Sequence, residues 1–581
     1  MSEGNDIVLG IDLGTSNSVA CTYIDGKPVF IPSSDGTNIY GPSFPSYVAF
    51  TDGGSVLVGE PAKRRYVSYP EDVVRAIKRE MGEIVKKEYK GKLYSPQEIS
   101  ALILGKIKKD AEIFLKKPVK DVIITVPANF DDNQRTATKD AAKIAGLNVN
   151  DLINEPTAAC LAYGVNNQSN GLQRILVFDL GGGTLDVTIM EHGAIFKVKS
   201  IKGDTNLGGN DMDNIISNFL IKEFEKQHGV RLNLNNKLKN RLMEAAERAK
   251  IDLSSVYETE VNLPFMGMDS NGNPLDLVTT ITRPQLDDLV RPIVNRCGGT
   301  IQAALDGAGF TKNDIDKLIL VGGPTRMPIV RKFVQNFIGL TAEESIDPMS
   351  CVAQGAALKG ASYYENDDGE IESVPDFIDV IPLSLGIISK GRVTEVIVKA
   401  DTEVPIKEKK KFRTVKDNQR TIKVEIVQGE FKMADKNTYL GSFLLNIEPA
   451  PKGRVKVEII FEIDKSGILN VTAIDETTGN KKSLTLDSPN KMSEYEIRKA
   501  IKEYKLLAEQ DETERILQGM KNDAYSVIDD AKNLIDKYDI NYSDKNEIKT
   551  LIKSLEEAID SNNPRGIKKK TVQLNKLILR L

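Results

Sequence analysis

Two spacings of apolar residues alternate over residues 1 to about 370. Short β-branched runs such as Ile7–Ile11 and 174–178 predict strands. Longer stretches, in which apolar residues recur three and four positions apart, predict helices. These helical stretches cover residues 97–116, 132–145, 211–228 and 236–251. Alternating strands and helices are typical of an α/β domain.

The spacing changes to period two in the next part of the chain. Ile422, Val424 and Ile426 share one face of a predicted strand, and Lys423 and Glu425 share the other. The same alternation runs through Val455, Val457, Ile459 and Phe461. Turn-forming segments such as "EPAPKG" and "DETTG" separate these runs. This pattern predicts an all-β module of about a hundred residues, a sandwich.

Helical spacing returns at "KMSEYEIRKAIKEY". Ser493 and Glu496 form a capping box, which marks the start of a helix. An apolar stripe follows at Ile497, Ile501, Tyr504 and Leu507. Further helices are predicted on both sides of a break at "NNPRG" (562–566). The tail is therefore expected to be a small helical bundle.

A shift in composition marks the boundary between the first two modules. The segment "YYENDDGEIESVPDFIDVIP" is acidic and then carries Pro375, the apolar pair 377–378 and Pro382. We place the α/β domain at 1–371, the linker at 372–380, the sandwich at 381–489 and the helical tail at 490–581.

Composition narrows the possible functions. The chain has 581 residues, which is too long for one core, and a net charge of −5, which argues against a strongly basic nucleic-acid binder. Neither a signal peptide nor an apolar stretch long enough to span a bilayer is present, so we expect a soluble cytoplasmic protein. Four widely spaced cysteines and two histidines make disulfides or a histidine metal site improbable.

Two segments share one sequence pattern that is typical of a turn between strands, "LGIDLGTSNSV" and "VFDLGGGTLDV". In the first copy Asp12 ends a strand, Gly14 permits a tight turn, and Thr15 and Ser16 add hydroxyl groups. The second copy repeats the design with Asp179, Gly181, Gly182, Gly183, Thr184 and Asp186. Backbone N–H groups and one carboxylate in each turn could hold a polyphosphate and its cation.

The alternative is that both copies are ordinary hairpin turns. The repeated threonine after the glycines favours the phosphate interpretation. Because the chain contains no G-x-x-x-x-G-K-[ST] motif, this phosphate site is not of the strand–loop–helix kind.

The chain resembles the DnaK-type heat-shock chaperone family over nearly its whole length. The resemblance rests on motifs in family order: "GIDLGTSNS", "AIKREMG", "TVPANFDDNQRTATKDAAKIAGLNV", "INEPTAA", "FDLGGGTLDV", "GDTNLGGND", "AAERAK", "LVGGPTRMP" and "DVIPLSLGI". It implies an α/β actin-like ATPase domain, then an all-β peptide-binding sandwich, then an α-helical lid. It also implies that ATP or ADP binds with Mg²⁺, and K⁺ is possible.

The resemblance assigns roles in hydrolysis to several side chains. Asp12 and Asp179 would surround Mg²⁺ through its waters, which suits a cation that dehydrates reluctantly. Lys78 would oppose the charge on the transferring phosphoryl oxygens. Glu155 and Asp186 would orient the attacking water, and Thr15 and Thr184 would hydrogen-bond phosphate oxygens.

The residues themselves leave two of these roles open. Lys78 could be a lysine on the surface of a helix. Glu155 could be a first-turn carboxylate beside Pro156.

The resemblance also implies a nucleotide pocket with two departures from the family pattern. Close backbone approach is expected at Gly14, Gly181, Gly182, Gly183, Gly208, Gly209, Gly322 and Gly323. Adenosine contacts are expected from Glu247, Lys250 and Ser254, with Ser16 and Arg326 completing the pocket, although such helical spacing is more often a solvated stripe. Ile251 replaces the arginine that stacks on adenine, and Pro324 replaces a serine. Nucleotide affinity and base selectivity should both be affected.

The sandwich should hold an extended apolar peptide. The matching positions are Ile387, Phe412, Val415, Ile422 and Val424. Their alternative role is simply to fill the core of the sandwich. Lys390 stands at an arch position that is usually apolar, which could favour acidic clients.

Coupling between the domains is assigned to Pro127, Arg135, Asp151 and Asp379. Asp151 departs from the family, which usually has an arginine there on the surface that receives the J-domain cochaperone. Its alternative role is that of an exposed acid beside a helix. The expected partners are unfolded or extended polypeptides, a J-domain cochaperone and a nucleotide exchange factor, with neither nucleic acid nor membrane.

Three functions remain at this point. The first is an ATP-dependent chaperone that binds and releases apolar peptide segments. The second is a passive peptide holdase with a weak or uncoupled ATPase. The third is a small-molecule kinase on the actin-like fold, which leaves the sandwich and the tail unexplained. Coupling between nucleotide and peptide is required only by the first.

Overall fold

The computed structural model describes residues 7–36, 41–166, 171–193, 195–363, 377–389, 391–464, 469–485, 492–537, 542–578 and 580. Its contacts divide the chain into two compact units. The first comprises residues 1–51 and 57–501, and the second comprises residues 502–581 together with 52–56. Among the described helices, none combines the length and apolar character needed to cross a membrane.

The first sheet of the large unit is built on the predicted N-terminal hairpin. Its strand order is β11-β10-β1-β2-β3, with β4 also paired to β2. β1 runs antiparallel to β2 and parallel to β10. The bounds are β1 (Val8–Asp12), β2 (Asn17–Ile24), β3 (Lys27–Phe30), β4 (Ser43–Pro45), β10 (Asp121–Val126) and β11 (Asn148–Asn154).

The second sheet repeats this arrangement around the second hairpin. Its order is β17-β12-β13-β14-β18, in which β12 is antiparallel to β13 and parallel to β17. The bounds are β12 (Gln173–Leu180), β13 (Leu185–His192), β14 (Phe196–Asp204), β17 (Lys317–Val321) and β18 (Phe377–Ile378). Asp12 and Asp179 thus lie in equivalent places, at the ends of the first strands of the two hairpins.

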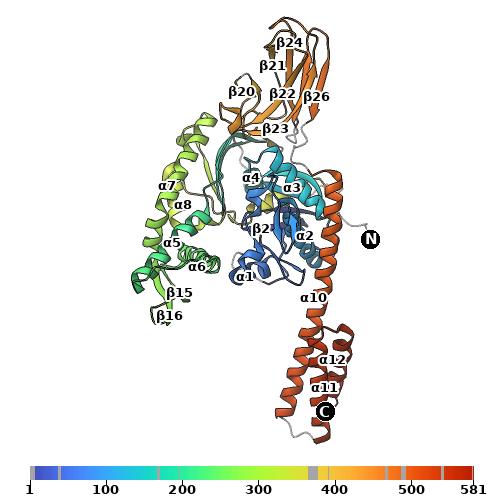
Figure 1. Ribbon diagram of the computed structural model, residues 1–581. Coiled ribbons are helices and arrows are strands. Elements are labelled where there is room, and N and C mark those ends of the chain that lie inside the picture. The colour runs from blue at the N-terminus through green and yellow to red at the C-terminus, as the bar shows by residue number, and fades with distance from the viewer. Residues whose placement is uncertain are drawn as a thin grey trace. The chain divides into compact units, whose positions relative to one another are not determined.

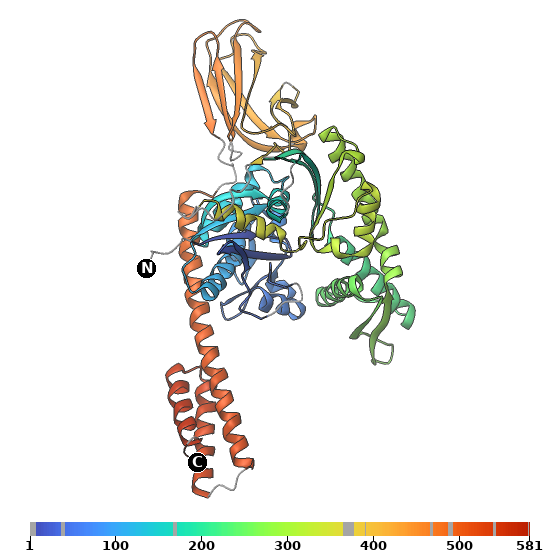
Figure 2. The ribbon, with the colours of Figure 1, turned by 180° about the vertical axis from the view of Figure 1, so that it is seen from behind.

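Helices cover both sheets, and they form two lobes of one α/β domain (Figures 1 and 2). Their bounds are α1 (Glu60–Ser68), α2 (Pro96–Leu115), α3 (Asp132–Ile144), α4 (Glu155–Asn166), α5 (Gly209–His228), α6 (Asn236–Ser255), α7 (Arg283–Ala308), α8 (Pro328–Ile338) and α9 (Cys351–Ala361). Smaller sheets complete the domain. One has the order β6-β5-β7, with bounds β5 (Val48–Phe50), β6 (Val56–Val58) and β7 (Val73–Val74). Others pair β8 (Lys87–Tyr89) with β9 (Lys92–Tyr94), and β15 (Glu258–Met268) with β16 (Pro274–Thr282). The four predicted helices begin and end within four residues of the expected positions.

Local capping explains where two of these helices begin. The hydroxyl of Ser95 accepts from the Glu98 N–H, and Glu98 accepts from the Ser95 N–H, so α2 begins with a capping box. Asp131 and Gln134 form the same reciprocal pair before α3. The start of α3 is therefore fixed beside the end of β10.

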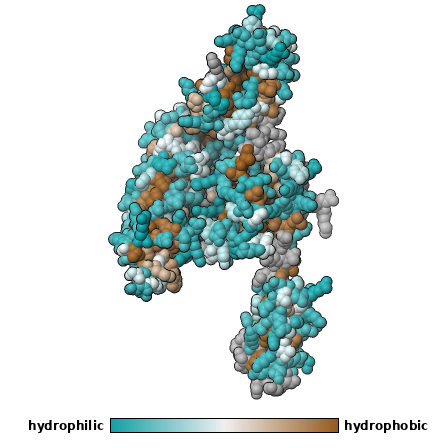
Figure 3. Space-filling view, viewed as in Figure 1, coloured by the Kyte–Doolittle hydropathy of each residue, from teal (hydrophilic) through white to brown (hydrophobic). Residues whose placement is uncertain are grey.

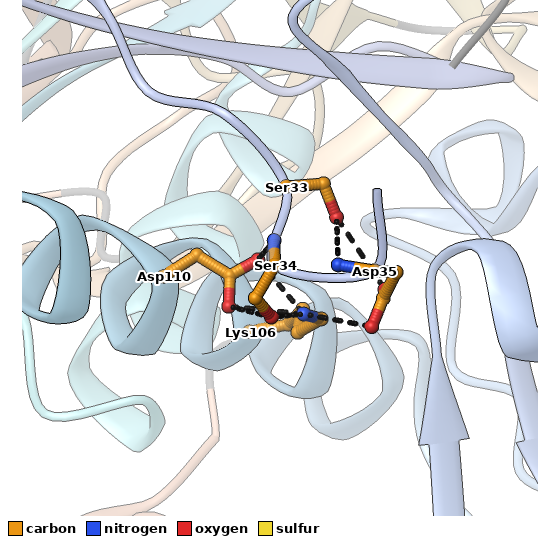
Figure 4. Close-up of polar contacts among 5 residues, drawn as sticks. All are labelled: Ser33, Ser34, Asp35, Lys106 and Asp110. Carbon is orange, nitrogen blue, oxygen red and sulfur yellow. Dashed lines mark hydrogen bonds and ion pairs between the residues drawn. The ribbon is translucent and has the colours of Figure 1, made fainter. Parts of the chain in front are cut away.

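The loop after β3 is tied to α2 by one ammonium group (Figure 4). Lys106 donates to Asp110 at 2.8 Å and to the Ser34 hydroxyl at 2.8 Å, and it pairs with Asp35 at 3.3 Å. The Asp110 side chain is fully buried. A buried carboxylate needs such a partner, so the contact fixes the loop on the helix.

Glycines allow α9 to pack directly on the first sheet and on α4. A β-carbon at Gly10 would lie 2.0 Å from the backbone nitrogen of Ala357, and one at Gly355 would lie 1.7 Å from the carbonyl oxygen of Ala158. This close packing brings α4 and α9 together. Because Glu155 is the first residue of α4, the packing also helps to position that carboxylate.

The second module is the expected sandwich. One sheet has the order β20-β19-β22-β23 and the other β21-β24-β25-β26. The bounds are β19 (Leu385–Ser389), β20 (Val393–Val398), β21 (Ile406–Arg413), β22 (Thr421–Gln428), β23 (Thr438–Asn446), β24 (Lys456–Ile463), β25 (Leu469–Asp475) and β26 (Lys481–Thr485). The inward faces carry the predicted alternating residues, since Val424, Ile426, Val457, Ile459 and Phe461 are all buried.

Part of the expected linker has regular structure. Residues 377–378 form β18, which adds a short parallel strand to β14 through the pairs Phe196–Phe377 and Lys197–Ile378. Part of the expected linker therefore forms an edge strand of the second sheet. Residues 372–376 of the expected linker lie outside the described residues.

The tail is helical, as predicted. The capping box is confirmed, because Ser493 and Glu496 exchange hydrogen bonds at the start of α10 (Glu494–Lys537). In the second unit, the C-terminal part of α10 packs with α11 (Tyr542–Asp560) and α12 (Pro564–Ile578). Their shared core contains Ile528, Ile548, Leu555, Ile567 and Leu574.

We predict that Gly355→Ala destabilises the α/β domain by about 1–3 kcal/mol, because the new methyl group overlaps the Ala158 carbonyl. Gly299→Ala is the matched control. It is also inside a helix, its β-carbon would meet nothing within 4 Å, and it should be neutral or stabilise by up to about 1 kcal/mol. Urea unfolding followed by circular dichroism tests this, and equal midpoints for the two variants would contradict it.

Candidate active site

The two hairpins face one cavity of about 370 Å³ between the lobes. Most of the residues expected at the site line it: Asp12, Gly14, Thr15, Ser16, Lys78, Glu155, Asp179, Gly181, Gly182, Thr184, Gly209, Glu247, Lys250, Ser254, Gly322, Gly323 and Arg326. Three other expected residues, Gly183, Gly208 and Asp186, do not line it. The cavity thus brings together residues more than three hundred positions apart in the sequence.

Close packing of the turns explains why glycine is needed there. A β-carbon at Gly182 would lie 2.4 Å from the Ser16 hydroxyl of the opposite hairpin. One at Gly208 would lie 2.6 Å from the backbone nitrogen of Gly183. The N–H groups of Gly209 and Asn210 bond back to the carbonyls of Gly181 and Gly182. The turns are thus held close enough together to enclose a small anionic group.

Lys78 is buried, so the alternative of a surface lysine is wrong. It lies in the short helix η2 (Ile77–Glu80), and its ammonium donates to Glu155 Oε1 at 2.6 Å. Burial favours the neutral lysine, but Glu155 and Asp12 outweigh it and raise the Lys78 pKa above its ordinary value. Lys78 is therefore a fixed positive charge in the cavity.

Three aspartates lie around this charge, and burial raises the pKa of each. The pKa of Asp12 rises to about 7 and that of Asp186 to about 8, with repulsion from Glu155 adding to the effect of burial. The pKa of Asp179 is raised for the same two reasons. One oxygen of Asp186 is buried without a hydrogen-bond partner among the described residues. Such a site gains from a further cation.

The arrangement fits a cation that brings its own ligands. Among the described residues, no group of three or more Asp, Glu, His or Cys side chains is arranged to hold a metal alone. Mg²⁺ commonly keeps several waters and binds through one or two carboxylates together with phosphate oxygens. Asp12 and Asp179 are the carboxylates available for such an ion, and the N–H groups of the turns are available for the phosphate oxygens.

The other end of the cavity is formed largely by α6. Lys250 is buried and pairs with Asp213 at 2.6 Å, and its ammonium also reaches the Gly209 carbonyl at 3.2 Å. Ser254 donates to the Lys250 carbonyl at 3.1 Å. Ile251 and Pro324, the two departures from the family pattern, both line the cavity. Position 251, where the family pattern has an arginine, thus adds an apolar side chain to the cavity wall.

Several contacts at the site were not anticipated. Arg79 donates to the Gly183 carbonyl at 2.7 Å, and Lys63 on α1 pairs with Glu247 at 3.3 Å. Asp213 and Met349 are also new to the site. Arg79 follows Lys78 directly, and that adjacency was the available signal. Nothing local in the sequence distinguishes Lys63 from other lysines.

Three of the four expected coupling residues meet at a second cavity, of about 80 Å³. Arg135, Asp151 and Asp379 line it, whereas Pro127 is buried at the end of β10. Asp151 lies within β11 and accepts from the Tyr363 hydroxyl at 3.3 Å, so it is not an acid beside a helix. Asn154 donates to Asp379 at 2.5 Å, which joins the linker to the residue before Glu155.

The sandwich contacts the α/β domain elsewhere too. Asp401 accepts from the Ile201 N–H at 3.1 Å and pairs with Lys202 at 2.5 Å. Gly307 on α7 lies against this contact, since a β-carbon there would be 2.4 Å from the Ser200 hydroxyl and 3.2 Å from Asp401.

The expected peptide-binding residues do not form one exposed groove in this structure. Ile387 and Val424 are buried in the sandwich core, and Phe412 and Ile422 pack against it. Only Val415 is well exposed. This arrangement agrees with the core-filling alternative for Ile387 and Val424. Apolar residues still reach the surface of the sandwich, as the brown regions among its hydrophilic surface show (Figure 3). Lys390 lies outside the described residues.

Known proteins resemble this chain along almost its whole length. The profile of the family described as "Hsp70 protein" matches residues 8–88 and 83–581. The chaperone protein DnaK of Methanothermobacter thermautotrophicus is 50% identical over 575 residues, covering 98% of this chain and 95% of that protein. DnaK proteins of Picrophilus torridus and Thermoplasma acidophilum are 47% and 46% identical, each over 98% of this chain and over 93% and 92% of their own length. The chain therefore belongs to the Hsp70 protein family.

Proposed function

We propose that the chain is an ATP-driven chaperone that binds and releases apolar segments of unfolded proteins. The family is one of ATPases, and its known function is ATP-coupled peptide binding. The observation that supports this most directly is the buried Lys78–Glu155 pair, which faces two phosphate-type turns in one cavity. The chain is inferred to act in the cytoplasm.

The side chains divide the work of hydrolysis among them. ATP or ADP would bind with Mg²⁺, which would supply positive charge to the phosphate oxygens, and K⁺ would be a further ion. Asp12 and Asp179 would hold the hydrated Mg²⁺ ion. Glu155 and Asp186 orient the attacking water, and Lys78 opposes the charge on the transferring oxygens. Thr15 and Thr184 hydrogen-bond the phosphate oxygens.

The contacts of the linker support coupling between hydrolysis and the sandwich. Asp379 is bonded to Asn154, and Asn154 accepts from Arg135 at 2.6 Å. Asn154 is followed directly by Glu155, which contacts Lys78. A displaced linker would therefore disturb the end of β11, where the water-orienting carboxylate begins α4. This is a contiguous set of contacts between the two sites.

The alternatives are less well supported. A small-molecule kinase leaves the sandwich and the tail without a role, whereas the family match includes both. A passive holdase would bind peptides without a response to ATP. Proposed partners are extended polypeptides, a J-domain cochaperone and a nucleotide exchange factor, and the net charge of −5 gives no reason to propose nucleic acid.

We predict that Lys78→Ala slows single-turnover ATP hydrolysis by roughly 10²–10³-fold, because it removes one electrostatic stabiliser of the transition state. ATP should still bind. Lys226→Ala is a control, because it removes an exposed lysine of α5 outside the cavity. Rapid-mixing hydrolysis assays measure the rate, and an unchanged rate in Lys78→Ala would contradict the assignment. Peptide release by ATP in the parent protein would exclude the passive holdase.

We predict that Ile251→Arg tightens ATP binding by up to about thirtyfold. An arginine can add a cation–π contact with adenine worth about 0.5–2 kcal/mol, and 1.4 kcal/mol corresponds to about tenfold in affinity. Ile251→Leu keeps an apolar wall and should bind as the parent does. Titration with fluorescent ATP checks this, and equal or weaker binding by the arginine variant would argue against an adenine contact at 251.

We predict that Asp151→Arg increases stimulation of the ATPase by a standard J-domain, most clearly at low salt. The J-domain motif contains an aspartate, and two facing carboxylates repel by about 1 kcal/mol in water and about 4 kcal/mol at an effective dielectric of 20. Asp151→Asn removes the repulsion without adding attraction and should fall between the two. Steady-state ATPase is measured against J-domain concentration, and three coincident curves at low salt would refute the idea.

A further inference from the structure

The cavity between the α/β domain and the sandwich carries an unusual balance of charge. It is lined by Asp132 on α3, Asp151 on β11 and Asp379 after β18, and by one cation, Arg135. The remaining wall includes apolar side chains of the sandwich, such as Leu385, Val404, Ile463 and Leu469. Three carboxylates and one guanidinium therefore share a small, largely apolar space.

Arg135 does not neutralise these carboxylates by direct contact. It donates to the Phe130 carbonyl at 3.2 Å and to the Asn154 amide oxygen at 2.6 Å. Asp132 has no hydrogen bond or ion pair among the described residues. It lies in the first turn of α3, where the helix dipole favours its negative charge but only partly offsets the lack of a partner. On the sandwich side, the amide oxygen of Gln428 is buried without a partner, and Gln428 is 5% exposed.

Burial raises the pKa of the carboxylates at this cavity. The pKa of Asp132 rises to about 6, since burial and repulsion from Asp131 outweigh Arg135 and Lys139. The pKa of Asp379 is also raised by burial, although Arg135 and the bonds from Val380 and Asn154 oppose the shift. Both shifts depend on the sandwich and linker covering these groups.

We propose that docking of the sandwich on the α/β domain takes up protons at this cavity, with Asp132 and Asp379 as the groups that accept them. Docked here means the arrangement in which β18 pairs with β14 and the sandwich covers this cavity. The interface can open, because β18 contributes only two residue pairs and much of the remaining contact is polar.

The other charged groups nearby are already engaged. Asp131 caps α3 and also accepts from Thr438 of the sandwich. Asp151 accepts from Tyr363, whose pKa is raised to about 12, so that hydroxyl stays protonated near neutral pH. Lys197 pairs with Glu403 across the same interface at 2.7 Å. Undocking would also uncover Asp131, whose pKa is raised by burial, but Asp131 keeps the bond from the Gln134 N–H. The proton uptake is therefore assigned to Asp132, which has no such bond in the described part of the chain, and to Asp379 on the linker, which undocking would itself move.

The sign of the effect follows from linkage. A carboxylate whose pKa is higher in the docked state weakens docking at every pH above that pKa. Docking becomes stronger as the pH falls from the pKa of the docked state to the pKa of the undocked state. Each such group changes the docking equilibrium by up to about tenfold per pH unit within this window. For Asp132 the window lies between about pH 6 and its ordinary value of 3.8. The inference concerns docking itself, so it does not depend on peptide binding or hydrolysis.

Fluorescence energy transfer between Asn233→Cys and Asn480→Cys tests the proposal on the full chain. Both positions are exposed, and the four native cysteines are buried and should not react with the dyes. The docked fraction is measured from pH 8 to pH 5.5, with and without a saturating ATP analogue that is not hydrolysed. We expect the ratio of docked to undocked parent to rise by about threefold, and to do so below about pH 6, where the Asp132 window begins.

The carboxylates of the nucleotide site also have raised pKa values, so they could add to a pH dependence of docking. Matched variants separate their contribution from that of this cavity. Asp132→Asn and Asp379→Asn each remove one charge and should dock more at pH 8, and the double variant should lose most of the pH dependence. Asp288→Asn removes an exposed carboxylate of α7 and should behave as the parent. Thermal unfolding identifies any variant that is misfolded. A parent whose docking does not change with pH, or a folded double variant with the full pH dependence, would overturn the proposal.

Discussion

The buried ammonium of Lys78 lies among four carboxylates that it cannot neutralise alone. Glu155 takes the direct hydrogen bond, while Asp12, Asp179 and Asp186 remain crowded nearby with raised pKa values. Like charges in a low dielectric repel strongly, so this group is stable only with protons or with added cations. A nucleotide bound with its metal ion would supply both kinds of charge. The metal ion would offset the carboxylates, and the phosphate groups would lie near the Lys78 ammonium.

The rest of the α/β domain serves to hold these groups at fixed positions. Two hairpins supply Asp12 and Asp179 from equivalent strand ends, and their glycines let the turns touch. The packing of α9 against α4 supports the start of the helix that carries Glu155. The linker contacts the same region through Asn154, so the position of the sandwich and the position of Glu155 are not independent.

Local signals made the hairpins, the helices and the alternating strands predictable, because each depends on residues close together in the chain. The Lys78–Glu155 pair could be assigned only by family resemblance, since 77 positions separate the two and neither has a distinctive local pattern. Ile387 and Val424 are core residues because of which faces of the two sheets meet, and the sequence pattern alone does not specify this. Strand β18 is two residues long and gains its conformation from β14, so its sequence alone read as a linker. The alternative that placed Asp151 beside a helix did not anticipate β11, whose first half, NVND, is polar.

Gly307 shows how closely the two domains approach. Its missing side chain leaves α7 room beside Ser200 and the sandwich residue Asp401, where even a methyl group would overlap. In the α/β domain alone, an added carbon would meet Ser200 and, at 3.2 Å, Lys202. In the two-domain protein it would also lie 3.2 Å from the Asp401 side chain, which would have to shift by a few tenths of an ångström. A substitution on a helix of the α/β domain would therefore be felt at a contact with the sandwich.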